Sequence, residues 1–248
     1  AADITQDQLA GILYDSLMEK IMPLEDDIIV YPAHGAGSAC GKNMMKETLD
    51  TLGNQKKMNY ALNQVNRVSF VAAVTDGLLP PPAYFGANVA MNKQGYESFE
   101  VVKEKGLKTF SCVDFQALAE IANALILDTR DSNDFYQGFI PQSINIGLNG
   151  EFAPWVGAMI GDVKQAILLV AKPGTEDEVI TRLSRVGFDT ILGFLDGGFE
   201  TWKNAGKEID QIHRINSSEF SEKFIPEKSV IIDVRKDTEY AANHVAEA

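Results

Sequence analysis

The first part of the chain carries apolar residues at helical spacing, interrupted by one short strand pattern. Residues 6–22 predict an amphipathic helix, which ends at Pro23. The β-branched run over residues 28–32 predicts a buried strand that leads into a glycine-containing loop over residues 34–41. Residues 44–75 repeat apolar positions at helical spacing again, so they predict a long helical stretch.

The second part of the chain has a different pattern. Pro80-Pro81-Pro82 ends the helical part, and the polar residues 93–110 are expected to form a linker. Short apolar runs then alternate with helical patterns. The predicted strands are 124–127, 166–170 and 190–194, and the predicted helices are 115–122, 133–136, 176–186 and 199–205. Because the strands are continuously apolar and lie between helices, they indicate a mostly parallel sheet covered on both faces.

Composition excludes several classes of partner. The chain has 248 residues, of which 45% are hydrophobic, and its formal net charge is -13. Nucleic acid and anionic membrane surfaces are unexpected partners, because binding phosphate requires clustered Lys and Arg. No apolar run approaches the ~20 residues of a spanning helix. The two cysteines, Cys40 and Cys112, are too few for a disulfide scaffold and favour a reducing cytoplasm, with Cys112 expected as a small buried hydrophobe. Whether the chain forms a homo-oligomer stays open.

An internal repeat is the most informative feature of the sequence. Three segments recur in the same order: Leu127-Asp128-Thr129-Arg130 as Ile232-Asp233-Val234-Arg235, Asp134-Phe135 as Glu239-Tyr240, and Phe139-Ile140 as His244-Val245. The offset is 233 minus 128, or 105 residues, which is the length of a domain. We therefore expect one complete α/β domain followed by the beginning of a second one.

The repeated segment resembles the first signature of the rhodanese family. That signature comprises an Asp-x-Arg turn, an acidic-aromatic pair and a Gly-His-Ile-Pro-Gly-Ala-like stretch, matched here by residues 128–130, 134–135 and 138–146. Residues 195–202 with Gly206 resemble the closing signature, Gly-Gly-x-x-x-Trp-x-x-x-Gly. The resemblance covers about residues 108–210, and residues 214–248 for the second copy. These residues also have a purely structural interpretation: Asp128 and Arg130 would pair across a turn, Gly197-Gly198 would allow a tight turn, and Trp202 would fill the core.

The rhodanese resemblance implies a nucleophilic cysteine just after the central strand. In this family, inward-pointing backbone N–H groups and a helix N-terminus stabilise that thiolate, which carries sulfur as a persulfide. Here Ala171 occupies the position after residues 167–170, so no catalytic residue is expected in the complete domain. Pro173 lacks an N–H, and Glu176 and Asp177 would repel an anionic substrate. The resemblance therefore implies a catalytically silent rhodanese-like domain.

The N-terminal part resembles the metallo-β-lactamase superfamily. Residues 30–35 resemble its final histidine motif, a strand that ends in a Pro-x-His loop with His34 as the histidine. The further segments 37–41, 51–59, 80–85 and 92–95 are similar to persulfide dioxygenase-like members, which occur in bacteria fused to two rhodanese domains, the first without its cysteine. A single loop histidine is more often an ordinary polar residue than a ligand. The context nevertheless favours a metal-proximal role for His34.

The resemblance implies a metal in the full-length protein. In mononuclear iron dioxygenases the counterpart of His34 lies near the iron, and in two-zinc hydrolases it binds the second metal. We expect iron, with zinc as the alternative. This chain alone is expected to hold neither ion, because the other ligands would precede Ala1 and only His213 and His244 remain besides His34.

The predicted organisation is α/β throughout. Residues 1–107 are assigned to the C-terminal part of a metallo-β-lactamase αββα domain, 108–210 to a rhodanese-like domain with a central parallel sheet, and 211–248 to the beginning of a second rhodanese-like domain. The expected parent is a persulfide dioxygenase–sulfurtransferase fusion acting on a small thiol persulfide, of which this chain would be an inactive internal piece. Two alternatives remain: a zinc-dependent thioester hydrolase of the glyoxalase II type, and a non-catalytic rhodanese-type binding or scaffold module.

Overall fold

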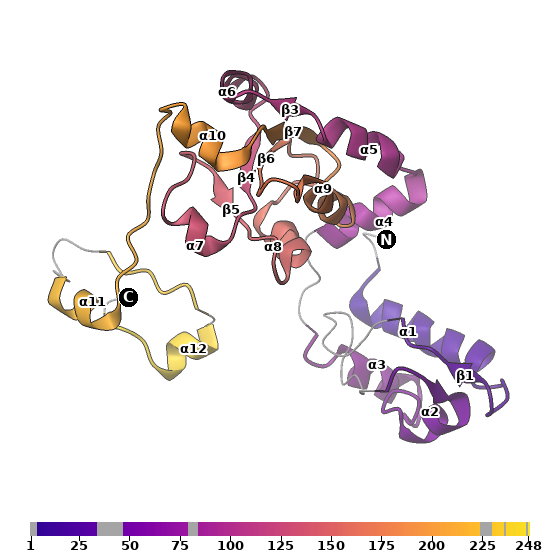
Figure 1. Cartoon of the computed structure of the whole chain (residues 1–248). Coiled ribbons are helices and arrows are strands. Elements are labelled where there is room, and N and C mark those ends of the chain that lie inside the picture. The colour runs from indigo at the N-terminus through magenta and orange to yellow at the C-terminus, as the bar shows by residue number, and fades with distance from the viewer. Residues whose placement is uncertain (1–3, 34–46, 79–83, 224–229, 236, 247) are drawn as a thin grey trace. The chain divides into compact units, whose positions relative to one another are not determined.

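The computed structural model divides the chain into two compact units, Ala1–Lys93 and Gln94–Ala248 (Figure 1). It describes residues 4–33, 47–78, 84–223, 230–235, 237–246 and 248. The glycine-containing loop expected over 34–41 and the proline run at 80–82 lie outside the described residues.

The first unit is mainly helical. Its elements are α1 (Gln6–Ser16), the π-helical turn η1 (Leu17–Ile21), β1 (Ile29–Val30), β2 (Asp50–Thr51), α2 (Leu52–Met58), α3 (Arg67–Thr75) and α4 (Tyr84–Gln94), whose last residue belongs to the second unit. A capping box between Thr5 and Gln8 starts α1, and α1 and η1 together confirm the helix expected over 6–22. Helices α1 and α3 pack together, and the fully buried ring of Phe70 lies 5.3 Å from that of Tyr14.

Two expectations for this unit are wrong. The strand expected to be buried is the short, exposed β1, which pairs antiparallel with β2 and leaves Ile29 47% exposed. The long helical stretch expected over 44–75 is broken into β2, α2 and α3. Asn59 ends α2 in an extended conformation, and the Asn66 side chain accepts the N–H of Ser69 to start α3. Asparagine side chains form hydrogen bonds with the backbone that compete with those of a helix. The prediction from apolar periodicity alone was therefore too long.

The second unit is built on a five-stranded sheet. Its strands are β3 (Thr109–Phe110), β4 (Leu125–Asp128), β5 (Ile144–Asn145), β6 (Ile167–Val170) and β7 (Ile191–Leu195), in the order β3-β7-β6-β4-β5. Every neighbouring pair is parallel, as expected. All four residues of the central strand β6 are fully buried, which explains their continuously apolar sequence. The sequence pattern revealed neither β5 nor β3, which lies in the segment expected to be a linker.

Helices cover both faces of this sheet. They are α5 (Phe99–Gly106), α6 (Cys112–Ile121), α7 (Ser132–Phe135), α8 (Phe152–Met159), α9 (Glu176–Ser184) and α10 (Gly198–Asn204). The chain continues into α11 (Ser217–Lys223) and α12 (Asp237–Ala242), which are not among the helices that cover the sheet. Leu168 and Val170 share a core with Phe115 of α6 and with Trp202 of α10. Helix α9 contacts α5 and α8, and Figure 1 shows these three helices on the other side of the sheet from α6 and α10.

The linker expected over residues 93–110 contains helix α5 instead. Val102 is buried, and Gly106 allows close approach to the side chain of Ile180 in α9. An ion pair of 2.8 Å between Lys103 and Asp177 joins the same two helices. Helix α5 therefore packs on the sheet unit, so the boundary between the units falls before it rather than between residues 107 and 108.

Candidate functional site

The carboxyl ends of β4, β6 and β7 open into a pocket of about 670 Å³. The loop after each of these strands contributes to its wall, and in parallel α/β sheets ligands bind outside the carboxyl ends of the strands. The residues that line it are Thr129, Arg130, Asp131, Asp134, Gln137, Gly138, Leu148, Asn149, Ala171, Lys172, Pro173, Thr175, Glu178, Gly197, Phe199, Glu200 and Lys203.

A paired Asp and Arg form the wall that follows β4. The Arg130 Nη2 lies 2.6 Å from Asp128 Oδ2 and donates a second bond of 2.9 Å to the carbonyl of Gly138. The guanidinium also lies 4.0 Å from the ring centre of Phe199. Asp128 is fully buried, and this burial raises the pKa of its carboxyl although the Arg130 guanidinium opposes the rise. With all these bonds made inside the domain, the pair fixes the turn.

The second copy of the motif adopts the same local conformation. Arg235 Nη2 lies 2.6 Å from Asp233 Oδ2 and 2.7 Å from the carbonyl of Asn243, which is the repeat equivalent of Gly138. The rings of Tyr240 and His244 stack 4.0 Å apart, like those of Phe135 and Phe139 at 4.3 Å. The sequence repeat is therefore also a repeat of conformation.

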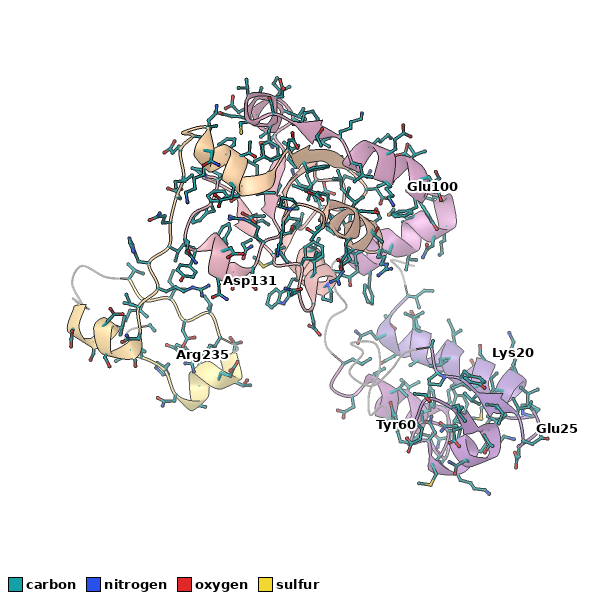
Figure 2. The ribbon with its side chains drawn as sticks, in the orientation of Figure 1. Lys20, Glu25, Tyr60, Glu100, Asp131 and Arg235 are labelled. Atoms are coloured by element: carbon teal, nitrogen blue, oxygen red, sulfur yellow. The ribbon has the colours of Figure 1, made fainter. Side chains whose placement is uncertain are left out.

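The surroundings of the two copies differ. Residues 230–235 belong to no strand of the described chain, and Val230 and Val234 are 89% and 91% exposed. Arg235, labelled in Figure 2, lies on this segment. The Asp233 side chain is 10% exposed on this segment, and its hydrogen bond with Arg235 outweighs desolvation and lowers the pKa of the carboxyl to about 2. The pKa of the aspartate is thus raised in the first copy and lowered in the second.

Ala171 lies in the wall of the pocket, directly after β6. Its side chain is a methyl group that is 3% exposed, and the loop that it begins leads into α9 at Glu176. Gly197 and Gly198 both have left-handed φ values, of 66° and 65°, and Gly198 lies against the carbonyl of Ala171. Among the residues that line the pocket there is no cysteine, serine or histidine, so the described wall offers no such nucleophile.

Most N–H groups of the loop after Ala171 already donate hydrogen bonds within the chain. Pro173 has none, and Thr175 donates its N–H to the Lys172 carbonyl at 3.0 Å. Gly174 donates its N–H to the Glu176 carboxylate at 2.8 Å. These groups are therefore already bonded within the loop, and a bound anion would have to displace such bonds.

Charges of both signs surround the pocket. Lys172 and Lys203 are its lysines, whereas Asp131, labelled in Figure 2, Asp134 and Glu200 are acids on other parts of its wall. Sequence reasoning named Asp134 only as part of the repeat and did not single out Lys203, Asp131 or Glu200; Asp131 follows β4 closely, whereas Lys203 and Glu200 lie within α10. The mixture does not create a strongly positive pocket for an anionic substrate.

The remaining sequence candidates lie elsewhere. His34 lies outside the described residues, and Cys112 is buried in the core between α6 and the sheet, as expected, and does not line the pocket. The described residues include no group of three His, Cys, Asp or Glu side chains placed to hold a metal ion. No helix in the described ranges is long and apolar enough to cross a membrane.

The family described as "Rhodanese-like domain" matches residues 111–205, the segment that contains the sheet and this pocket. Residues 111–205 are a rhodanese-like domain. In this domain the position after the central strand is Ala171. No curated protein matches the chain significantly.

Solved structures extend the similarity beyond the rhodanese-like domain. A metallo-beta-lactamase from Staphylococcus aureus subsp. aureus COL is 26% identical, with a TM-score of 0.61, and the match covers 75% of this chain and 50% of that one. A Rhodanese_3 like domain from Anabaena sp is 19% identical over 38% of this chain and 98% of that chain, with a TM-score of 0.34. A thiosulfate sulfurtransferase from Pseudomonas aeruginosa is 22% identical over 43% of this chain and 20% of that chain, with a TM-score of 0.35.

The chain thus combines a metallo-β-lactamase-type segment with a rhodanese-like domain, which confirms the predicted fold class. It spans about half the length of the staphylococcal protein.

Proposed function

We propose that residues 94–210 act as a catalytically silent rhodanese-like module within a persulfide dioxygenase–sulfurtransferase protein. The observation that carries the proposal is the methyl group of Ala171 at the pocket, after the central strand. Sulfur transfer through a persulfide needs a thiolate, because only a nucleophilic sulfur can accept and hold the sulfane atom. The bonded N–H groups of Gly174 and Thr175 add a second reason why an anion gains little there.

The substrate proposed for the whole protein is a low-molecular-weight thiol persulfide. An iron centre with open positions for O₂ would supply the oxidation, and zinc is the alternative metal. The described residues do not fit the role of binding such an ion by themselves, since they contain no group of three suitable side chains. His34 is proposed to lie beside that centre, with the metal held by other residues of the whole protein.

The test compares this chain with the full-length protein. We expect the full-length protein to contain iron and to consume oxygen with glutathione persulfide, whereas residues 1–248 neither bind iron tightly nor consume oxygen. Stoichiometric iron with oxygen uptake in residues 1–248 would refute the assignment. Zinc with thioester hydrolysis in the full-length protein would instead establish the glyoxalase II-type alternative.

A non-catalytic binding role is the second candidate, and an exposed apolar pair favours it. Trp155 and Met159 lie one turn apart on α8 and are 58% and 61% exposed. Both line a hollow of about 420 Å³ beside Asn149 and Asp131. Exposed apolar side chains that adjoin one another in a patch are more typical of binding sites than single ones are. If the full-length protein had no enzymatic activity, this face would be the first to test for a partner.

A further inference from the structure

Four charged side chains that line the pocket beside Ala171 form no ion pair or side-chain hydrogen bond with another described residue. They are Asp134, Lys172, Glu200 and Lys203. The other charged side chains of the wall already have partners: Arg130 pairs with Asp128, Glu178 pairs with Arg182, and Asp131 accepts the N–H of Asn133. The pocket thus keeps two cations and two acids available to a ligand.

These four groups come from segments that only the fold brings together. Asp134 lies on α7, which follows β4, and Lys172 lies in the loop after β6. Glu200 and Lys203 lie three residues apart on α10, a spacing at which opposite charges can pair on a helix. They do not pair with each other, so both charges stay free for contacts outside α10.

The pocket offers a bound thiol no reactive partner. The methyl group of Ala171 is 3% exposed, and the lining residues include no cysteine, serine or histidine. The volume of about 670 Å³ lies within the range of small-molecule sites, about 300–1,000 Å³. A thiol or persulfide held here would keep its sulfur, because sulfur transfer needs a nucleophile on the protein.

We propose that this pocket reversibly binds a zwitterionic thiol peptide, a molecule with two carboxylates, one ammonium and a thiol or persulfide. Lys172 and Lys203 bind the carboxylates, and Asp134 and Glu200 bind the ammonium. The acids repel a purely anionic carrier, and a neutral carrier gains from none of the four charges. The inference rests on the proposed function, from which it takes a small thiol as the carrier, and it adds the chemical class of that thiol.

The test titrates isotope-labelled residues 1–248 with reduced glutathione, which carries this set of groups. We expect the amide resonances of Ala171, Lys172 and Lys203 to shift in NMR spectra with a common dissociation constant. N-acetylglutathione lacks the ammonium, and glutathione diethyl ester lacks both carboxylate charges. Each lost ionic contact should weaken binding about two- to fivefold, the range of an exposed ion pair.

Matched substitutions assign each group of the ligand to its residues. Glu200→Gln should weaken the binding of glutathione about two- to fivefold but not that of N-acetylglutathione, whose ammonium is already gone. Lys203→Gln should weaken the binding of glutathione to a similar extent but not that of the diethyl ester. Lys207→Gln, the same change in the separate pocket beside Trp202, should leave the binding of all three ligands unchanged.

Several outcomes would overturn the proposal. They are unchanged resonances of the pocket on addition of glutathione, and variant effects of equal size on intact and blocked glutathione. Tighter binding of thiosulfate than of glutathione would also overturn it, since that order indicates a plain anion site. None of these assays involves iron or oxygen. If glutathione does not bind here while the full-length protein consumes oxygen with glutathione persulfide, this inference fails and the proposed function stands.

Discussion

At the scale of single residues, the surroundings of an aspartate decide its pKa even where its hydrogen bonds are the same. Asp128 with Arg130 and Asp233 with Arg235 make the same set of hydrogen bonds, including a closest contact of 2.6 Å in each copy. Asp128, fully buried at the end of a sheet strand, has a raised pKa, whereas Asp233, on a segment that belongs to no strand of the described chain, has a lowered one. Desolvation penalises a carboxylate only where water has been removed, so the sheet around Asp128 makes the difference.

The first prediction concerns the titration of these two carboxyl groups. In carboxyl carbon NMR, Asp233 should titrate at about 2 and Asp128 above the ordinary aspartate range. The folded chain holds the Asp128 proton more tightly than the unfolded chain does. This group alone therefore makes the free energy of unfolding decrease as the pH rises from the unfolded pKa through the folded one. The lowered pKa of Asp233 has the opposite sign, since the stabilisation of its local turn by Arg235 is present at neutral pH and is lost as the pH falls through about 2. Coincident titration of both groups would contradict this account.

The second prediction uses the repeat as its own control. Arg130→Ala leaves the buried Asp128 carboxylate unpaired and should destabilise the second unit by about 3–5 kcal/mol. Arg235→Ala removes the equivalent but exposed group and should leave that unfolding transition unchanged. Urea unfolding followed by fluorescence measures both variants. Equal losses of stability would mean that burial is not the deciding factor.

At the scale of elements, close contacts between neighbouring strands determine which glycines can be replaced by a residue with a side chain. Gly193 in β7 has a φ of 144°, and a side chain there would meet the Lys108 carbonyl and the ring of Phe110, which lie in and beside β3. Gly174 also has a positive φ, but a side chain there would meet nothing within 4 Å. A substitution at Gly174 would therefore add backbone strain alone, whereas one at Gly193 would add both strain and steric crowding.

The third prediction follows from that contrast. Gly193→Ala should destabilise the second unit by about 2–4 kcal/mol, because it adds crowding between β7 and β3 to backbone strain. Gly174→Ala should cost only the strain, about 1–2 kcal/mol. Chemical denaturation of the two variants provides the comparison. A loss for Gly174→Ala as large as that for Gly193→Ala would argue against crowding at the edge of the sheet.

At the scale of the molecule, the two units have separate cores. Phe70 is fully buried in the first unit and Leu168 in the second. Both tryptophans, Trp155 and Trp202, belong to the second unit, so tryptophan fluorescence reports on that unit alone. This distribution allows the independence of the two cores to be measured in the intact chain.

The fourth prediction is that each core unfolds by itself. Leu168→Ala should lower the stability reported by tryptophan fluorescence by about 2–5 kcal/mol. Phe70→Ala, a comparably severe change in the first unit, should leave the fluorescence midpoint where it is while reducing the helical signal in circular dichroism. A shift of the fluorescence midpoint by Phe70→Ala would show that the two cores unfold cooperatively.

The sequence by itself determined the features that depend on local pattern. Continuous apolar runs predicted the parallel strands β4, β6 and β7, and the repeat predicted the turn that Arg130 and Arg235 both form. The position of Ala171 after the central strand also followed from the order of residues. Each of these features depends on contacts between residues close in sequence or on the spacing of apolar residues. Both can be recognised in the sequence itself.

Only the tertiary structure decided which partners distant segments would choose. Helix α5 joins the sheet unit because Val102 and Lys103 find partners there, which a polar local sequence could not indicate. Similarly, Glu176 and Asp177 are adjacent acids that look alike in sequence. One bonds to the loop and the other to α5, because the packing of α5 places Lys103 beside Asp177 alone. Burial and pairing between remote segments depend on the whole fold, so they are fixed only once the chain has packed.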